Sequence, residues 1–344
     1  MLSSKRSKDY LDTRTVTHRL YALFSEVLAE KNRTRYHEGL WGSYGHVATP
    51  SGAHRRVRFV ADLCDLARFS PEGKVILDAG CGYGVIAIIL ALMGANKVVG
   101  VDISEERLTT FAQIIRDYGF DQQLEARLQR AEDTSLPNAS VDAVISNEAI
   151  SHYYDVDAFL RETARVLKPG GVLLISDGNN ACSPLRRRHT QEIWERFENG
   201  PAGTVHGHVL AVPYIEMRRQ IIRSAGPDLP DDVVERIAQR TSYLRKEEVL
   251  QALKEYLTTG QMPHSTFDRN RCPVNPLSGA YMEHMFYPPE LARQLEGYGF
   301  RARYYAALGG AVPVWMAPLD RVFHALTPLT LPLARAFRIT AVRQ

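Results

Sequence analysis

The residues best suited to chemistry are two carboxylates and three glycines in the segment KVILDAGCGYGVIAIILALMGANKVVGVDIS (74–104). They are Asp78, Asp102, Gly80, Gly82 and Gly84. Because glycine has no Cβ, a turn built from these glycines can adopt unusual backbone angles and let a ligand approach closely. The carboxylate of Asp102 can accept hydrogen bonds from both hydroxyl groups of a ribose. The pattern therefore predicts a site for a nucleoside.

The apolar runs around these residues predict the elements that position them. Residues 75–77 and 97–101 have the composition of buried strands, and the apolar stretch 85–93 predicts a helix between them. A strand, a glycine-rich turn, a helix and a second strand form the start of a nucleotide-binding α/β unit. Such a unit binds its ligand at the carboxyl ends of its strands, where both carboxylates lie.

Asp78 distinguishes this pattern from a dinucleotide-binding turn, because the spacing is D-x-G-x-G-x-G and not G-x-G-x-x-G. A carboxylate at the mouth of the turn would repel a pyrophosphate, but it would attract a ligand that carries ammonium and sulfonium charges. S-adenosylmethionine carries both charges. The segment resembles the first motif of the class I methyltransferases, whose second strand ends on a ribose-binding acid. The alternative is an ordinary α/β turn that carries an acid by chance.

A second segment resembles the stretch of the same family that contacts adenine. It is the sequence AED that begins at Ala131. The resemblance implies that the backbone of Ala131 contacts the adenine ring and that Glu132 or Asp133 accepts a hydrogen bond from the adenine amino group. It also implies a contact between the ring and Ile103.

The order of the later segments extends the resemblance over residues 55–180. A β-branched run at 141–146 predicts the fourth strand, and a helix at 156–167 is predicted to stop at the glycines of KPGG, before the fifth strand. Residues 301–308 and the C-terminal FRITAVRQ predict the last two strands. The resemblance implies an α/β fold with a Rossmann-like, mostly parallel sheet of seven strands, helices on both faces and an antiparallel last strand.

The predicted organisation has three parts. They are an N-terminal helix with an aromatic and glycine-rich lid (1–54), the S-adenosylmethionine-binding domain (55–180 and 281–344), and a mainly helical insertion after the fifth strand (181–280). The insertion fits no motif of the common fold, and it could be a cap over the carboxyl edge of the sheet or a homodimer interface. Its arginines at 186–188 could bind an anionic acceptor or begin a solvated helix.

Polar residues follow the predicted fourth strand, at the edge of the sheet where α/β folds bind ligands. Asn147 is a candidate for donor binding, and Glu148 and His152 are candidates for catalysis. Because the ordinary pKa of a histidine is about 6.5, His152 could remove a proton from an acceptor hydroxyl near neutral pH. It could also line the pocket or have a structural role only.

Aromatic residues alternate with glycines near the N-terminus, in RYHEGLWGSYGHVATPSG. In related small-molecule methyltransferases such a segment closes over the donor and helps to form the acceptor pocket. Tyr36, Trp41 and Tyr44 are therefore candidates for acceptor binding, and their rings could face a sulfonium. The alternative is a surface loop that its aromatic side chains pin to the domain.

Composition restricts the classes of partner. The net charge is +3, and the 42 basic and 39 acidic residues are spread along the chain, so no nucleic-acid partner is predicted. The four cysteines have neither CxxC spacing nor a clustered arrangement, which predicts a reducing compartment such as the cytoplasm and no zinc site. No other metal site is predicted.

The apolar stretches predict no integral membrane segment. The longest run, 85–93, is shorter than the roughly 20 residues that a spanning helix needs. The first twenty residues contain no continuous apolar region of the kind found in a signal peptide. The segment ALTPLTLPLARAF (325–337) could touch a membrane surface, and its alternative role is a core helix whose length is limited by prolines.

These features predict methyl transfer from S-adenosylmethionine to a small or medium-sized acceptor, at a hydroxyl or carboxyl oxygen of a specialised metabolite, sugar or lipid-like molecule. Transfer to nitrogen or carbon of a small molecule is the first alternative. RNA or protein is disfavoured as the acceptor, because the chain has no basic cluster and NEAI does not resemble an NPPY-type motif. A non-catalytic donor-binding subunit is the remaining alternative, and the two intact acids argue against it.

Overall fold

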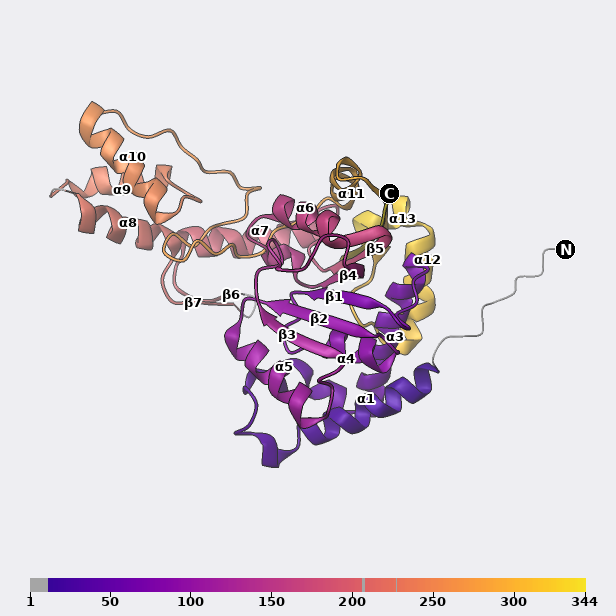
Figure 1. Cartoon of the computed structure of the whole chain (residues 1–344). Helices are drawn as coiled ribbons and strands as arrows, with labels where there is room; N and C mark the ends of the chain where they lie inside the picture. The colour runs from indigo at the N-terminus through magenta and orange to yellow at the C-terminus, as the bar shows by residue number, and fades with distance from the viewer. Residues whose placement is uncertain (1–11, 206–207, 227) are drawn as a thin grey trace. The chain divides into compact units, whose positions relative to one another are not determined.

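The computed structural model describes residues 12–205, 208–226 and 228–344, which form two compact units (Figure 1). The first unit runs as far as Asn180 and resumes over Tyr287–Gln344, and the second is Ala181–Phe286. The described part of the N-terminal segment belongs to the first unit and shares its hydrophobic core.

The first unit is built on a seven-stranded sheet with the order β3-β2-β1-β4-β5-β9-β8 (Figure 1). The strands are β1 Val75–Ala79, β2 Lys97–Asp102, β3 Leu124–Leu128, β4 Val141–Asn147, β5 Leu167–Asp177, β8 Phe300–Ala307 and β9 Ala336–Arg343. β1 to β5 pair in parallel, and β9 pairs antiparallel with both β5 and β8. The structure thus confirms the predicted Rossmann-like sheet and its antiparallel last strand.

Helices cover the sheet of the first unit. They are α1 Thr13–Val27, α2 Gly39–Tyr44, α3 Pro50–Ala67, α4 Val85–Leu92, α5 Glu105–Asp117, α6 Val156–Val166, α11 Pro288–Gly297, α12 Ala317–Ala325 and α13 Thr327–Thr330. Short 3-10 turns lie between them, at η1 Glu30–Asn32, η2 Gly45–Ala48, η3 Ile150–His152, η4 Val314–Met316 and η5 Leu331–Leu333. Every residue of α4 is buried, and α1 and α3 pack against it, which explains why the sequence VIAIILAL is apolar on all sides. Ser104 caps α5 by accepting from the backbone N–H of Arg107, as its sequence predicts.

The KPGG sequence does not end a helix, which corrects the sequence prediction. α6 ends at Val166, and the next residue, Leu167, is already extended and begins β5. Val141 of β4 pairs with Leu167, but Ala143 pairs with Val172, so the residues between them on β5 form a bulge. The left-handed backbone of Gly170, at φ 77°, therefore serves a strand irregularity and not a helix cap.

The second unit is mainly helical, as its sequence predicts. Its elements are α7 Pro184–Asn199, β6 Gly203–Val205, β7 His208–Leu210, α8 Tyr214–Ala225, α9 Asp231–Arg240 and α10 Lys246–Thr259. α8 packs against α7, α9 and α10. Arg218 of α8 and Glu198 of α7 form a buried ion pair at 2.6 Å, which fixes these two helices against each other.

Two further observations bear on the sequence predictions. No helix within the described part of the chain is long and apolar enough to cross a membrane. Cys64, Cys81 and Cys272 are buried free thiols.

Candidate functional site

The glycine-rich turn lies between β1 and α4 and is held against the end of β2. The backbone N–H groups of Gly80 and Cys81 donate to the carbonyl of Val101 at 2.9 and 3.0 Å. Gly82 has φ 54°, which disfavours any other residue, and the space that its Cβ would occupy is open. A ligand can therefore approach the backbone of the turn at Gly82.

The neighbouring glycines are required for another reason. A Cβ on Gly80 would lie 2.4 Å from the Cβ of Ala149, and one on Gly84 would lie 2.1 Å from the ring of Phe111. Both positions thus need glycine because the core packs against them. Of the three glycines, only Gly82 has the free approach that the sequence analysis expected of all three.

Asp102 is oriented toward the turn by two backbone donors. Its Oδ2 accepts from the N–H of Gly82 at 2.8 Å, and its Oδ1 accepts from the N–H of Ser104 at 2.9 Å. Each carboxylate oxygen has a second lone pair, so both remain able to accept from the hydroxyl groups of a ribose. The predicted role of Asp102 is therefore compatible with its hydrogen bonds.

A cavity of about 760 Å³ lies beside Asp102 in the first unit. It is lined by residues 34–37, by Ile103 and Ser104, and by the first turns of α5. Its volume falls in the range of about 300–1,000 Å³ that small-molecule sites occupy. The side chain of Ile103 is 73% exposed, so it offers an apolar surface that a flat ring could cover.

Asp78 lies beneath the turn and not at its mouth, which corrects its predicted position. The side chain is 2% exposed, and Oδ2 accepts from the N–H of Ala87 in the first turn of α4 at 3.2 Å. Burial raises the pKa of the Asp78 carboxyl to about 7, and the charge of Asp102 acts in the same direction. Asp78 therefore stabilises the turn by binding the backbone at the start of α4, and a direct contact between Asp78 and the ligand stays a prediction.

The raised pKa of Asp78 predicts a pH-dependent loss of stability. The folded state holds this proton more tightly than the unfolded state, whose carboxyl titrates near 4, so stability falls as the pH rises from about 4 to 7. Asp78→Asn removes this effect. We expect the free energy of unfolding of the variant, relative to that of wild type, to rise by about 2.5 kcal/mol between pH 5 and pH 7.5, measured by urea denaturation without ligand. A difference that stays constant across this range would contradict the prediction.

The AED segment forms a tight turn after β3, closed by a bridge between Arg130 and Asp133. Ala131 is buried, and Asp133 is exposed. Oε1 of Glu132 accepts from the backbone N–H of Tyr154 at 2.8 Å, so this acid holds the segment that leads into α6. Oε1 of Glu132 thus has a structural partner, and Glu132, Asp133 and the backbone of Ala131 all stay candidates for adenine.

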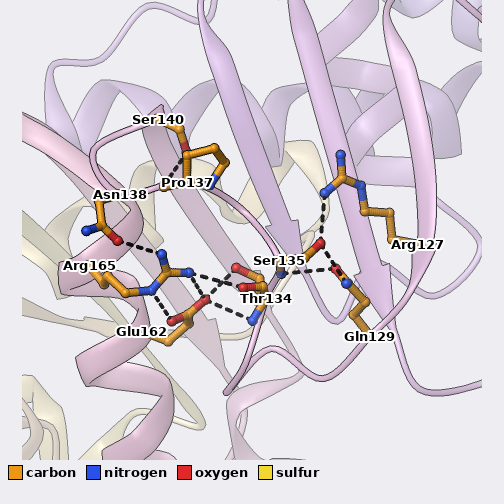
Figure 2. Close-up of polar contacts among 9 residues, drawn as sticks. All are labelled: Arg127, Gln129, Thr134, Ser135, Pro137, Asn138, Ser140, Glu162 and Arg165. Atoms are coloured by element: carbon orange, nitrogen blue, oxygen red, sulfur yellow. Dashed lines mark hydrogen bonds and ion pairs between the residues drawn. The ribbon is translucent and has the colours of Figure 1, made fainter.

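Side chains from β3 and α6 hold the start of the loop that follows AED, as Figure 2 shows. Oε1 of Glu162 in α6 accepts from the backbone N–H and the hydroxyl of Thr134 at 2.8 and 2.5 Å, and Arg165 donates to the same carboxylate at 2.7 Å. At the adjacent residue Gln129 donates to the hydroxyl of Ser135 at 2.8 Å. Burial raises the pKa of Glu162, but the hydrogen bonds from Arg165 and Thr134 outweigh it and hold that pKa below its ordinary value. The network stabilises the backbone that directly follows the adenine candidates.

The N-terminal aromatics divide into two groups. The hydroxyl of Tyr36 donates to Asp117 at 2.7 Å, and the indole N–H of Trp41 donates to the carbonyl of Leu28 at 3.0 Å. Both side chains pack against the core, which favours the alternative that they pin the segment to the domain. Tyr36 also lines the cavity beside Asp102, and the role of Tyr36 and Trp41 in acceptor binding stays a prediction. The ring of Tyr44 packs edge-on against Tyr83 of the glycine-rich turn, 6.0 Å between centroids, and its role in acceptor binding stays a prediction.

His37 is a site residue that the sequence analysis missed. Its Nδ1 lies 2.6 Å from the hydroxyl of Tyr83, and its backbone N–H donates to the hydroxyl of Thr110 in α5 at 3.0 Å. The N-terminal segment therefore reaches the glycine-rich turn through a hydrogen bond. The sequence carried no signal for this pair, because its two residues are far apart in the chain and each is common in loops.

Asn147 and Glu148 lie at the carboxyl end of β4, where the sequence predicts them. Oδ1 of Asn147 is buried and has no hydrogen-bond donor among the described residues. A buried acceptor of this kind is costly unless a ligand or water supplies the donor. Glu148 has φ 49°, a backbone conformation that is rare outside glycine, and its Oε2 accepts from the N–H of Gly178 at 3.2 Å.

His152 lies in the 3-10 turn η3 (Ile150–His152), and its side chain is exposed. Asp177, at the end of β5, is fully buried and holds this turn: its Oδ2 accepts from the hydroxyl of Ser151 at 2.9 Å. Burial raises the pKa of Asp177, and the hydrogen bonds from the N–H of Asn179 and from Ser151 oppose that shift. Asp177 is thus a positioning residue for η3.

The geometry fits S-adenosylmethionine at four points. They are the unobstructed backbone of Gly82, the remaining lone pairs of Asp102, the exposed side chain of Ile103 beside the cavity, and Oδ1 of Asn147, which has no hydrogen-bond donor among the described residues. All four lie in the first unit, on or after the carboxyl ends of β1, β2 and β4. No group of three or more histidines, cysteines or carboxylates suited to a metal occurs among the residues that the structure describes.

Known proteins support the same assignment. A family model described as a methyltransferase domain matches residues 70–240. A probable S-adenosylmethionine-dependent methyltransferase of Mycolicibacterium smegmatis is 35% identical over 127 residues, which cover 35% of this chain and 47% of that protein. The chain carries a class I S-adenosylmethionine-dependent methyltransferase domain. The cofactor of such a domain is S-adenosylmethionine.

Two further relatives of the methyltransferase domain act on small molecules, by their names. The dimethylglycine N-methyltransferase of Parasynechococcus marenigrum is 33% identical over 149 residues, which cover 42% of this chain and 53% of that protein. The ubiquinone biosynthesis O-methyltransferase of Xanthomonas axonopodis is 35% identical over 116 residues, which cover 33% of this chain and 46% of that protein. The chain thus spans about half the length of the relatives that it matches.

Proposed function

We propose that this protein transfers the methyl group of S-adenosylmethionine to an oxygen of a small or medium-sized acceptor, such as a hydroxyl or carboxyl group of a specialised metabolite, sugar or lipid-like molecule. The observation that carries the proposal is the polar edge after β4 and β5, where Glu148, His152 and Asp177 lie next to the donor candidates. The Xanthomonas relative is named as an O-methyltransferase, which agrees with this choice. Transfer to nitrogen is the second candidate, since the Parasynechococcus relative is named as an N-methyltransferase.

The proposed mechanism depends mainly on positioning. When bound, S-adenosylmethionine supplies a methyl carbon that is already activated for attack by a nucleophile, so the protein need not activate it further. Asp102 would hold the ribose, the N–H groups of the turn and Oδ1 of Asn147 would hold the amino-acid portion, and Ile103 would lie against the adenine. The acceptor oxygen must then be aligned with the methyl carbon, which is the task of the residues after β4 and β5.

His152 is the proposed general base for a hydroxyl acceptor. It lies on η3, whose position is fixed because Asp177 accepts from both the N–H and the hydroxyl of Ser151, at 3.4 and 2.9 Å. A base must stay within hydrogen-bond reach of the proton that it removes, so a fixed turn is suited to carry it. Glu148 is the second candidate for this role. A carboxyl acceptor, which is ionised near neutral pH, would need no base.

We expect His152→Ala to lower kcat by about 100-fold or more and to leave the affinity for S-adenosylmethionine within about twofold of wild type, because a general base acts only on the chemical step. Turnover and calorimetric donor binding measure the two effects separately. The control is His18→Ala, which changes an exposed histidine of α1 and should alter neither. A fully active His152→Ala enzyme would remove this residue as the base.

The identity of the acceptor requires a direct experiment. Purified protein is incubated with S-adenosylmethionine that carries a labelled methyl group and with fractionated small molecules of the host, and the labelled product is identified by its mass. A labelled oxygen supports the proposal, and a labelled nitrogen or carbon selects the alternative. Donor binding without transfer to any fraction would favour a non-catalytic donor-binding subunit.

We propose that the second unit (181–286) selects the acceptor or forms a homodimer interface, and that the protein works in the cytoplasm.

A further inference from the structure

A continuous row of large apolar side chains faces solvent on the segment between β8 and β9. We call it the apolar stripe, and its members are Trp315, Leu319, Val322, Leu326, Leu329 and Leu333. Their exposed fractions lie between 47% and 78%. The spacing of four, three, four, three and four residues is that of one helical face. A face this apolar is normally covered in a folded protein.

The backbone of the stripe is a chain of short helical pieces. It runs through η4 (Val314–Met316), α12, α13 and η5 (Leu331–Leu333), and prolines begin α13 and interrupt the path again at Pro332. Both α12 and α13 pack against β8 (Figure 1). The exposure of the stripe shows that its side chains face away from the sheet. A long coiled coil needs uninterrupted helices over several heptads, which the prolines prevent. The segment is better suited to lie flat against a surface.

The single carboxylate of residues 309–335 is turned inward. Asp320 is 4% exposed, accepts from Arg338 of β9 at 3.0 Å and from the N–H of Leu308 at 2.8 Å, and lies 3.5 Å from His324. Asp62 of α3 lies at the border of the segment, 4.0 Å from Arg321, and its side chain is only 27% exposed. The outward face of the segment therefore carries no exposed carboxylate.

Exposed arginines flank the stripe. Arg321, whose side chain is 74% exposed, and Arg335 belong to the segment itself. Arg303 of β8 is also exposed and lies on the same face of the sheet, because Tyr305, two residues further along that strand, contacts the ring of His324 in α12. The surface thus combines an apolar centre with a cationic border.

We propose that the apolar stripe and its arginines form a docking surface for a membrane leaflet that contains anionic lipids. The apolar side chains enter the boundary between headgroups and acyl chains, the indole of Trp315 lies at the headgroup level, and the guanidinium groups pair with lipid phosphates. A second copy of the chain fits this surface poorly. A twofold contact would bring the cationic borders of two copies together, with no exposed carboxylate of the segment to pair with the arginines.

The test is flotation of the full chain with vesicles of phosphatidylcholine alone or mixed with phosphatidylglycerol. We expect binding to the mixed vesicles that weakens as the salt concentration rises. Leu329→Glu with Leu333→Glu should lower the bound fraction by roughly tenfold or more, because two carboxylates enter the apolar contact. Arg321→Gln with Arg335→Gln should lower it by roughly fivefold for each arginine.

Trp315 provides a second readout. Of the three tryptophans, Trp194 is 4% exposed and Trp41 is partly buried in the core, so the indole of Trp315 is the one that a membrane can reach. We expect a blue shift of tryptophan fluorescence on addition of mixed vesicles. Trp315→Phe should abolish the shift and retain most of the binding in flotation.

The matched control is Leu257→Glu, which places the same charge at an exposed leucine of α10 in the second unit, 45% exposed. It should bind vesicles like wild type, and thermal unfolding and donor binding should show that all variants are folded. The proposal is overturned if wild type does not bind mixed vesicles, if the two glutamates leave binding unchanged, or if Leu257→Glu is equally impaired. A dimer in light scattering that dissociates in the glutamate variant, without vesicle binding, would assign the surface to a second copy.

Discussion

Asp102→Ala is expected to weaken S-adenosylmethionine binding by roughly 100-fold or more, because hydrogen bonds to a charged acceptor contribute about 1.5–3 kcal/mol each. The substitution removes the acceptor for both ribose hydroxyl groups. It also removes the oxygens that hold the N–H groups of Gly82 and Ser104 at 2.8 and 2.9 Å, so the turn loses its orientation. Isothermal titration calorimetry measures the dissociation constant directly.

Two companions sharpen the interpretation of Asp102→Ala. Asp102→Asn keeps the size of the side chain but leaves one carbonyl oxygen, and we expect an affinity between those of wild type and the alanine variant. Asp121→Ala removes an exposed acid from the loop before β3 and should bind the donor normally. Thermal unfolding establishes that each variant is folded. If Asp102→Ala binds S-adenosylmethionine with an affinity close to that of wild type, the assignment of Asp102 to the ribose is wrong.

Arg338→Ala is expected to lower the free energy of unfolding of the first unit by about 3–5 kcal/mol, the usual cost of leaving one partner of a buried ion pair. Arg338 is 1% exposed, its guanidinium lies 3.0 Å from Oδ2 of Asp320, and it covers the ring of Phe59 at 5.4 Å. Burial lowers the pKa of His324 to about 4, with the charge of Arg338 acting the same way, so this histidine is neutral at pH 7 in the wild-type protein. Arg338→Ala would leave Asp320 buried without its ion-pair partner.

The double variant Arg338→Met with Asp320→Leu is the matched control for Arg338→Ala. Apolar side chains of similar size remove both charges, so we expect most of the lost stability to return. Urea denaturation at pH 7 measures the free energies, and the thermal midpoint of Arg338→Ala should fall by roughly 10 °C. A shift within about 1 kcal/mol for Arg338→Ala would show that the pair does not hold β9 to α12, and a double variant as unstable as the single one would assign the loss to packing.

Several parts of the site could be predicted because their signals are local. The apolar runs of β1 and β2, the glycine spacing between them and the Ser104 cap of α5 depend on residues that are close in sequence, and the structure has each of them. Asp102 and Asn147 follow from the same logic, since the end of a parallel strand lies at the ligand edge of the sheet. The order of such elements was enough to predict the family.

Other residues depended on partners far along the chain. Glu132 accepts from the backbone N–H of Tyr154 and Tyr36 donates to Asp117, and the sequence predicted neither partner. The same reason explains the missed bond between His37 and Tyr83. A polar side chain in the folded state takes the nearest suitable partner in space, and spacing along the chain does not contain that distance.

The sequence by itself determined the α/β class, the glycine-rich turn and the acid that follows the second strand, because these depend on periodicity and on the absence of a Cβ. Only the tertiary structure decided which groups remain available to a ligand. It buried Asp78 beneath the turn and left Oδ1 of Asn147 without a donor among the described residues. It also turned Asp320 inward, so that the segment before β9 presents leucines and arginines to solvent. Burial and pairing are set by packing between distant segments, which no local pattern specifies.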